Sequence, residues 1–492
     1  MKTISQVLGK GLASITIECH GLKPEKFTRF ITHSFSNKTQ ILPDPKGDSF
    51  SSSMGVFLAG NNDTVYLFTQ PPGLSEWRKN HLGSKVKLIE INPRLGPNKE
   101  RGYPYGSINE ALFDNHTFVS KVKHLFKQPI LITTFPDESI CKQANKIGLR
   151  LIQYFNPKLA NSKSIFHQLS SKFEYSTCPS YIVRTDNDIK SAVKALSKFK
   201  RGVWVKADGS GGDTVNYLPK LTQNSLIIAI NKIRKTIINS FEHGGFTPGE
   251  KEKIINTDSL IPNSGVVVES DVRNFGRIIV NGSNFVLTGK SGKVELCGLY
   301  SQITKNGIFC GSRNLFDDEK FKRFLILKKI SKKQIVEMVR ENAQSVGKAI
   351  LSLNYFGIHG QDFFIVYTSK KELKIFNTEI NARIPNSGIA HMAAMKAEVN
   401  HFLMLNLKMK SGSCNTLKDF KKMVTIDSID YLNNEPKEGA IWPMAFKALW
   451  KKVKGKYILE EPSQLIRVVI LAKNSKIIDE IKNKLALRCD FV

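Results

Sequence analysis

Two carboxylates, an amide and an arginine whose spacing suggests a binding site occur between residues 357 and 388, where the chain reads GIHGQDFFIVYTSKKELKIFNTEINARIPNSG. Runs of strand-forming residues on either side of a polar turn predict a β-hairpin here. Alternation along its second strand places Glu379, Asn381 and Arg383 on one face, and the hairpin returns Asp362 to the side of Glu379. Such oxygens favour Mg²⁺ on nucleotide phosphates, and the arginine can hold a carboxylate or phosphate. An ordinary hairpin with a solvated outer face is the alternative.

A candidate phosphate-binding element lies upstream. The apolar strand GVWVK, residues 202–206, ends at Lys206 and leads into the segment ADGSGGDT. Glycines let backbone amides surround an anion, and the lysine adds a positive charge. No Gly-Lys-Ser/Thr follows, so the segment is not a Walker loop, and a plain turn is the alternative. The loop residues concerned are Gly209, Ser210, Gly211 and Gly212.

A third element, GVVVESDV at residues 265–272, reads as a buried strand that ends in polar residues. Alone, it indicates only an edge or core strand. Taken in order, the lysine strand with its glycine loop, the Val-Val-Val-Glu segment and the Asp…Glu-x-Asn-x-Arg hairpin resemble the ATP-grasp superfamily of carboxylate–amine ligases. The resemblance covers residues 156–407 and rests on order and spacing more than on any single motif.

The resemblance implies a role for each matching residue. Lys206, and Lys163 in Asn-Ser-Lys, are similar to the phosphate-binding lysines, and Arg383 to the arginine near the acyl-phosphate. The glycine loop resembles the lid over the triphosphate. The segment similar to the adenine-binding hinge consists of Glu269, Ser270, Asp271 and Val272. The residues similar to the metal ligands are Asp362, Glu379 and Asn381. The cofactors implied are ATP and Mg²⁺, with Mn²⁺ as a substitute.

Two positions depart from the family pattern. Some members carry an arginine two residues before the first metal carboxylate, where this chain has Gly360. The usual acidic residue for the ribose hydroxyls is also not evident, and Asp271 is the nearest candidate.

A helix is expected after the hairpin, at residues 389–405. Its start, with Ser387 and Gly388, could bind a substrate carboxylate through backbone amides. His391 lies in its first turn and is expected to pack or to touch substrate rather than to act as a base.

Length and composition agree with a multidomain enzyme. A chain of 492 residues, 41% hydrophobic, exceeds what one core usually organises. The sequence shows no run of eighteen apolar residues and no convincing signal peptide, so no membrane partner is expected. Seven scattered cysteines without a CxxC pair favour reduced thiols and a cytoplasmic location.

The formal net charge of +30 allows several partners. Nucleic acid, an acidic membrane surface or an acidic substrate could each explain it. Lysines are nevertheless spread along the chain in small pairs, such as 328–329 and 332–333, without an RNA-binding motif. A lysine-rich composition gives the same charge without any partner, so nucleic acid is not expected.

The predicted fold class is α/β (α+β), in three parts. Residues 1–155 are expected to form an open α/β layer that resembles a pre-ATP-grasp domain, and residues 156–407 an ATP-grasp fold of two α+β subdomains. Residues 408–492 are expected to form a small C-terminal α/β domain. Strands are predicted at 129–135, 149–155, 179–183 and 465–472, with two more around a turn within 55–68. Helices are predicted at 137–147, 162–171, 188–196, 221–238, 331–353 and 476–487.

The expected activity is formation of an amide or peptide bond through an acyl-phosphate, with release of ADP and phosphate. The layout looks most like the peptide ligases of pheganomycin-type biosynthesis, which implies an amino-acid or peptide carboxylate and an amine acceptor. A homodimer is compatible with this expectation. Two alternatives stay open: a small-molecule kinase on the same fold, and a basic nucleic-acid-binding protein.

Overall fold

The computed structural model describes residues 11–32, 52–68, 78, 85–91, 108–133, 138–151, 157–208, 215–244, 259–262, 265–305, 308–410, 440–444, 450–453, 456–459, 465–487 and 489–491. Within these residues no helix has the length and apolarity needed to cross a membrane.

The N-terminal region is built on a five-stranded, all-parallel sheet in the order β3-β2-β1-β4-β5. Its strand β4, with sequence PILIT, is buried throughout, as is typical of a parallel sheet covered on both faces. The open α/β layer expected here is therefore present. The strands are β1 (Thr28–Thr32), β2 (Thr64–Leu67), β3 (Lys87–Glu90), β4 (Pro129–Thr133) and β5 (Arg150–Leu151). The helices are α2 (Leu12–Cys19), α5 (Ile108–Phe113), α6 (His116–His124) and α7 (Glu138–Lys146).

One predicted strand in this region is wrong. Of the two expected within 55–68, only the second exists, as β2, because Ser52–Leu58 forms the 3₁₀ helix η2. Its residues Val56, Phe57 and Leu58 are buried but do not pair in a sheet. A short apolar run is compatible with either structure, and packing decides between them. Part of the strand predicted at 149–155 lies outside the described residues.

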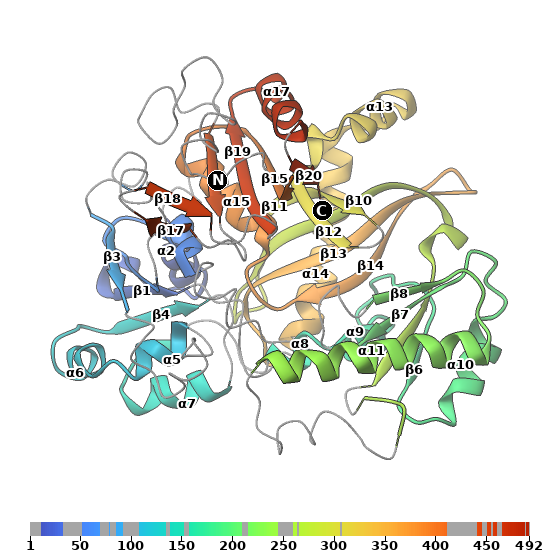
Figure 1. The fold of residues 1–492 in the computed structure, drawn as a ribbon, viewed down its shortest axis with the longest axis horizontal. Coiled ribbons are helices and arrows are strands. Elements are labelled where there is room, and N and C mark those ends of the chain that lie inside the picture. The colour runs from blue at the N-terminus through green and yellow to red at the C-terminus, as the bar shows by residue number, and fades with distance from the viewer. Residues whose placement is uncertain are drawn as a thin grey trace.

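A small antiparallel sheet follows, in the order β6-β9-β7-β8. It lies at the lower right of Figure 1, where β6, β7 and β8 are labelled. Two helices cover one of its faces through a shared apolar core. The strands are β6 (Ser180–Val183), β7 (Val203–Ala207), β8 (Val215–Leu218) and β9 (Val266–Ser270). The covering helices are α10 (Asp188–Leu196) and α11 (Gln223–Gly244), and the short α8 (Pro157–Ala160) and α9 (Lys163–Leu169) precede the sheet.

The largest sheet has nine strands in the order β14-β13-β10-β11-β12-β15-β19-β16, with β20 also paired to β15. Most of its strands join antiparallel neighbours. They are β10 (Gly276–Thr288), β11 (Val294–Lys305), β12 (Ile308–Asn314), β13 (Gly357–Thr368), β14 (Leu373–Asn381), β15 (His401–Met409), β16 (Ala440–Met444), β19 (Leu465–Ala472) and β20 (Cys489–Phe491). A separate hairpin joins β17 (Trp450–Val453) to β18 (Lys456–Leu459).

Helices pack on both faces of the large sheet. On one face, α13 (Glu319–Lys328) and α14 (Lys332–Leu351) share a core with Phe363 and Ile365. A capping box at Ser331 and Gln334 fixes the start of α14 close to the predicted position. On the opposite face, α15 (Asn386–Lys396) packs against Phe285.

The helix predicted at 389–405 is wrong in its extent. Helix α15 ends at Lys396, Glu398 adopts a positive φ of 56°, and the residues from His401 onward form β15. A left-handed residue after the last turn ends a helix. The apolar residues of 402–407 satisfy a helix or a buried strand equally well, and pairing with β12 and β19 selects the strand.

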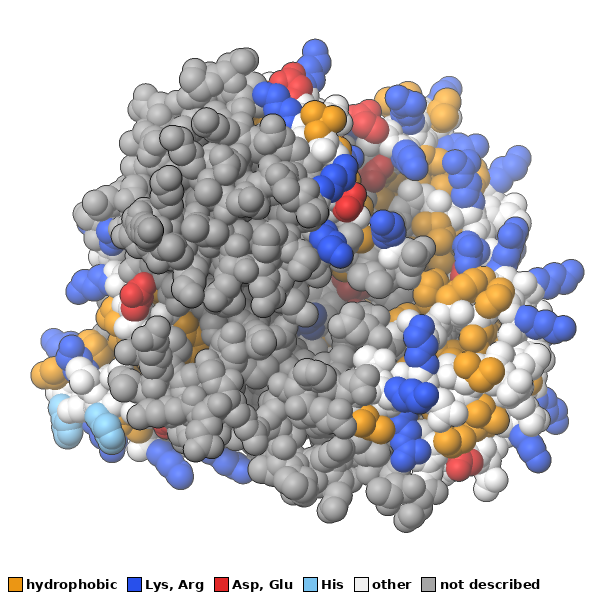
Figure 2. Space-filling model, viewed as in Figure 1, with side chains coloured by type: hydrophobic (Ala, Val, Ile, Leu, Met, Phe, Trp, Pro, Cys, Tyr) orange, Lys and Arg blue, Asp and Glu red, His pale blue; other side chains and the backbone are white. Residues whose placement is uncertain are grey.

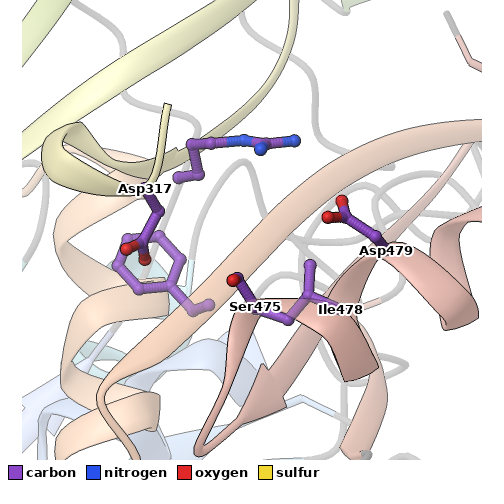
Figure 3. Close-up of a pocket in the computed structure, with 6 residues that line it drawn as sticks. Asp317, Ser475, Ile478 and Asp479 are labelled. Atoms are coloured by element: carbon purple, nitrogen blue, oxygen red, sulfur yellow. The ribbon is translucent and has the colours of Figure 1, made fainter. Parts of the chain in front are cut away.

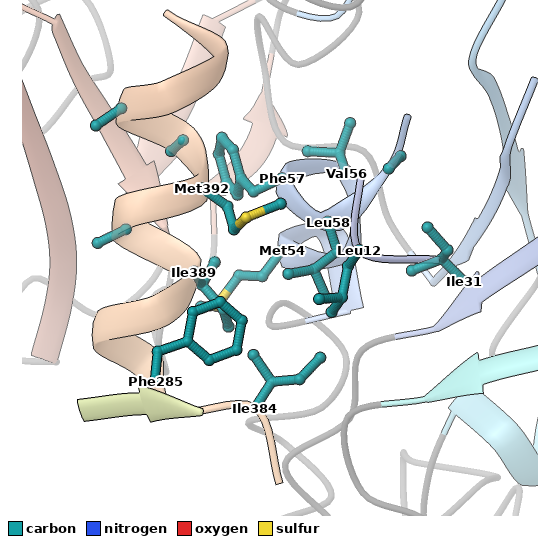
Figure 4. Packing of buried hydrophobic residues seen from close by; sticks show 14 of the residues in the cluster. Leu12, Ile31, Met54, Val56, Phe57, Leu58, Phe285, Ile384, Ile389 and Met392 are labelled. Atoms are coloured by element: carbon teal, nitrogen blue, oxygen red, sulfur yellow. The ribbon is translucent and has the colours of Figure 1, made fainter. Parts of the chain in front are cut away.

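Helix α15 lies at the junction of the N-terminal region and the large sheet. Figure 4 shows Ile389 and Met392 pointing toward Phe57, Leu58 and Met54. The helix is buried nearly all round, as expected for a helix enclosed by protein on every side.

The C-terminal residues extend the large sheet. Strand β15 crosses residue 408, where a domain boundary was expected, and β19 pairs with it over its whole length. Helix α17 (Ser475–Ala486) packs on these two strands. The strand and helix predicted near 465–472 and 476–487 are thus present, but they continue the central sheet.

Candidate active site

The β13–β14 hairpin places the two predicted metal carboxylates opposite each other by means of a β-bulge. Phe363 pairs with Asn377, so an unbroken ladder would next set Thr378 opposite Asp362. The register shifts instead, and Asp362 pairs with Glu379. Thr378 is the extra residue, and its Oγ1 donates a hydrogen bond to the Asp362 carbonyl oxygen at 3.0 Å. Because side chains alternate along a strand, this bulge brings Glu379 to the face that carries Asp362.

Polar side chains hold the Asp362 carboxylate from two directions. Gln302 Nε2 donates to Oδ1 at 2.8 Å, and Asn381 Nδ2 donates to Oδ2 at 3.1 Å. Burial, together with the facing Glu379 carboxylate, raises the pKa of Asp362. Arg383 is near enough to both carboxylates to oppose their charge. Like charges held together in this way favour binding of a cation.

Lys163 supplies the counter-charge for the second carboxylate. Its Nζ lies 2.9 Å from Glu379 Oε2, and its side chain is only 5% exposed. Burial acts to raise the pKa of Glu379, but the charges of Lys163, Lys206 and Arg383 together outweigh it, and the pKa falls below its ordinary value.

The start of α9 is tied to both sheets, which fixes Lys163 in place. Ser162 Oγ and Ser164 Oγ donate to Asp208 Oδ2, at 2.9 and 2.5 Å, just beyond the end of β7. Asn161 Oδ1 accepts the backbone N–H of Ala382, just beyond β14, at 2.7 Å. A single helix turn therefore joins the small sheet to the large one.

A second lysine–carboxylate pair lies on the small sheet. Lys206 Nζ is 2.7 Å from Glu269 Oε2, between the neighbouring strands β7 and β9. His167 Nε2, one turn after Lys163 on α9, lies 3.4 Å from the same oxygen. Burial opposes both charges, yet the pKa of Glu269 is lowered and that of Lys206 is raised because each stabilises the other.

The other predicted hinge residues are placed differently from Glu269. Ser270 donates its backbone N–H to Pro179 O at 2.8 Å, and Asp271 donates its own to Gly202 O at 3.0 Å. The Asp271 carboxylate accepts the backbone N–H of Arg273 at 2.8 Å and caps the 3₁₀ helix η6 (Val272–Asn274). Trp204 Nε1 donates to it at 3.2 Å as well. Asp271 thus secures the chain after β9.

The predicted lid residues Gly209, Ser210, Gly211 and Gly212 lie outside the described residues. The strands on either side are described, and Lys206 pairs with Val215 across β7 and β8.

The predicted substrate residues Ser387 and Gly388 lie in the packed start of α15. Ser387 is buried, and the Gly388 N–H donates to Pro385 O at 2.9 Å. His391 Nδ1 is 3.0 Å from the Tyr300 hydroxyl, and burial lowers the pKa of His391 to about 4. These contacts assign His391 to the core.

Several residues at this site were not identified from the sequence. Asn161 and Asp208 adjoin predicted residues, so their place in the chain could have suggested them. Gln302 and His167 come from distant elements, and no local pattern marks them. All four contact the predicted charged residues or the chain segments that hold them.

Two further features of the described residues concern other possible sites. Within the described residues no three His, Cys, Asp or Glu side chains converge on a possible metal position. The predicted metal set of two carboxylates and an amide is not such a cluster, and it stays a prediction. A small cavity of about 10 Å³ lies between β12, β15 and α17, as Figure 3 shows. It has room for roughly one water molecule and shares no residue with the site above. Its lining consists of Arg313, Asp317, Phe402, Ser475, Ile478 and Asp479.

Comparison with known proteins shows the fold. No protein-family model and no curated protein matches the chain. Biotin carboxylase from Campylobacter jejuni, solved as a β-γ-ATP complex, matches with a TM-score of 0.52 and 10% identity, over 94% of this chain and 91% of that one. Pyruvate carboxylase from Rhizobium etli, solved with acetyl coenzyme A, matches with a TM-score of 0.50 and 11% identity, over 93% of this chain and 37% of that one. The chain therefore has the ATP-grasp fold.

Proposed function

We propose that this protein is an ATP-dependent carboxylate–amine ligase that forms an amide or peptide bond and releases ADP and phosphate. The observation that carries the proposal is the pairing of Lys163 with Glu379 and of Lys206 with Glu269, joined by the contacts of α9. A nucleotide triphosphate brings negative phosphate oxygens, which buried lysines can bind, and a metal cation, which buried carboxylates can bind. The ATP-grasp fold and the ATP complex of the similar biotin carboxylase support a nucleotide as that ligand.

Mg²⁺ fits the hairpin by its donor set. Asp362, Glu379 and Asn381 would hold it with hard oxygen ligands, and the two carboxylates face each other across the paired strands. When bound, Mg²⁺ would neutralise phosphate charge during phosphoryl transfer. Lys163 and Lys206 would then bind phosphate oxygens in place of their present carboxylate partners.

Arg383 would orient the acid. A guanidinium beside Asp362 and Glu379 can hold the substrate carboxylate while its oxygen attacks the γ-phosphorus and ADP leaves. The amine would next attack the acyl carbon, lose a proton and expel phosphate. Arg383 would stabilise the oxyanion formed in that step. The glycine loop at 209–212 is proposed to exclude water from the acyl-phosphate.

The substrate class is the finer part of the proposal. An amino-acid or short-peptide carboxylate and an amine acceptor are proposed from the resemblance to pheganomycin-type peptide ligases. Screening amino acids and peptides for amine-dependent ADP release identifies the pair. Production of AMP and diphosphate would contradict the acyl-phosphate route, and a stable phosphorylated hydroxyl would select the kinase alternative.

Hydroxylamine tests the role of Arg383 directly. As the amine, it should yield a hydroxamate that reports the activated acyl group. Arg383→Lys should lower hydroxamate formation by about tenfold or more while nucleotide binding is retained, because a point charge replaces a planar fork. Arg340→Lys, in an exposed ion pair with Glu337, is the matched control and should leave the rate unchanged.

A further inference from the structure

Two adjacent aliphatic side chains stand in solvent at the end of α13. Ile326 is 76% exposed and Leu327 is 79% exposed, whereas Phe321, Phe324 and Leu325 of the same helix are buried. The apolar side chains on the inward face of α13 are thus already packed in the core. The two side chains together form a small exposed apolar area at this end of the helix.

Five exposed cations lie within six residues of this aliphatic pair along the chain. Arg323, Lys328, Lys329, Lys332 and Lys333 are all exposed, and together with Ile326 and Leu327 they are called the α13 tip here. The lysines form two pairs, 328–329 at the end of α13 and 332–333 at the start of α14, and two residues separate the pairs.

The acidic side chains that flank the tip do not neutralise it. Glu319 pairs with Lys322, and Glu337 pairs with Arg340. Figure 2 shows Lys and Arg side chains beside hydrophobic ones at the upper right, where Figure 1 places α13. Lysines at a helix C-terminus also stabilise the helix dipole, but the dipole does not account for an exposed Ile-Leu pair.

We propose that the α13 tip docks on an anionic lipid surface. The two aliphatic side chains would enter the boundary between headgroups and acyl chains, while the five cations meet the lipid phosphates. The tip is the end of a helix that projects from the molecule (Figure 1), and a projecting end suits a soft, flat surface better than a protein groove. This contact needs no membrane-spanning segment.

The neighbouring aromatic rings argue against nucleic acid as the occupant. Single-stranded nucleic acid binds where rings are open for base stacking. Here Lys328 Nζ lies 5.0 Å from the centre of the Tyr367 ring, and Lys332 Nζ lies 5.3 Å from that of Phe316. Both rings are half-buried with a lysine over one face, and the exposed apolar side chains at the tip are the aliphatic pair.

Vesicle co-sedimentation tests the proposal on the full chain. Vesicles of phosphatidylcholine mixed with phosphatidylglycerol should bind the protein about tenfold or more tightly than pure phosphatidylcholine, and added salt should weaken that binding. The Ile326→Ser/Leu327→Ser double variant and the Lys328→Glu/Lys329→Glu double variant should each lower binding by about tenfold.

Matched controls come from α11. It also exposes an isoleucine, Ile228 at 61%, and two lysines, Lys232 and Lys235. Ile228→Ser and Lys232→Glu/Lys235→Glu should bind anionic vesicles as the wild type does. Equal binding to neutral and anionic vesicles, or equal loss in tip and α11 variants, would overturn the proposal. So would RNA binding that the tip lysine variant abolishes and the Ile326→Ser/Leu327→Ser variant retains.

Discussion

The charged residues of the candidate site are arranged as mutually dependent pairs. Lys206 and Glu269 are each almost enclosed by protein, with side-chain exposures of 12% and 3%. Lys163 is similarly enclosed beside Glu379. A buried charge is tolerated when its partner is present and becomes costly when the partner is removed. Single substitutions at these positions therefore affect stability as well as activity, and each test needs a variant that separates the two.

Glu379→Gln should abolish ATP turnover while the fold persists. The amide keeps the shape and can still accept a hydrogen bond from Lys163, but one of two facing carboxylates loses its charge. Loss of that charge should weaken Mg²⁺ on the phosphates by several kcal/mol, so the rate of ADP release should fall by about a thousandfold or more. Circular dichroism checks the fold, and Glu372→Gln in the hairpin turn is the control. Turnover at the wild-type rate would show that the site is assigned to the wrong residues.

Glu269→Gln should reduce the free energy of unfolding by about 3–5 kcal/mol, because Lys206 would lose the carboxylate that contacts it directly. The Lys206→Met/Glu269→Gln double variant removes the stranded charge and should recover part of the loss. Urea unfolding of wild type, both single variants and the double variant measures the coupling between the two positions. Additive effects would mean that the two side chains do not stabilise each other.

Among the secondary-structure elements, the hairpin could be predicted from its residues, but its bulge could not. Alternation and the polar turn indicate two paired strands, and the residue types indicate the chemistry. The shift at Thr378 depends on side chains from elsewhere. Asn377 Nδ2 donates to Ser176 O at 3.0 Å, and Asn377 and Asn342 of α14 exchange hydrogen bonds of 2.8 and 2.9 Å. No pattern within the hairpin contains this information.

The same limit explains the other differences between sequence and structure. The apolar runs at 55–58 and 402–407 identify buried segments correctly, but their secondary structure is decided by what covers them. Helix α14 was predicted closely because its capping box and its amphipathic period are local, and α10 because its amphipathic period is local. The lysine and carboxylate residues were predicted from order along the chain, while Gln302 and His167 required the fold.

Asn377→Ala should lower stability by about 1–3 kcal/mol, since it leaves buried polar partners unsatisfied next to the bulge. It should also raise the Mg²⁺ concentration at which turnover saturates, because Glu379 lies two residues further on. The matched variant Asn342→Ala breaks the same pair from α14. A double-mutant cycle should show strong coupling in unfolding free energy. If turnover of Asn377→Ala saturates at the wild-type Mg²⁺ concentration, the network supports the fold without positioning the carboxylate.

On the scale of the whole molecule, α15 connects the N-terminal layer to the large sheet through an apolar contact that contains one buried lysine. Lys396 Nζ donates to the carbonyl oxygen of Ala59, and its residue is 8% exposed. Asp63, which pairs with Arg29 at 2.5 Å, is the nearby carboxylate. This junction places the hairpin and its Arg383 relative to the N-terminal sheet, so its strength bears on how the proposed substrate site is assembled.

The stability of this junction should depend on pH through Lys396. Burial lowers the pKa of Lys396 from 10.5 to about 8, and Asp63 offsets only part of that effect. Between those values the unfolded chain holds more protons than the folded one, so the free energy of unfolding rises with pH and the penalty is greatest below about pH 8.

Replacement of this lysine by methionine removes the titrating group while keeping a long apolar stem. Relative to Lys396→Met, the wild type should gain roughly 1 kcal/mol of stability between about pH 7 and pH 9. Urea unfolding of both proteins at each pH measures the difference, and their shared tyrosines, which stay protonated longer in the folded state, cancel in the comparison. The matched control is Lys235→Met on the exposed face of α11, whose stability relative to wild type should not change with pH. If the difference in free energy of unfolding between the wild type and Lys396→Met stays constant across this range, Lys396 keeps its proton inside the junction.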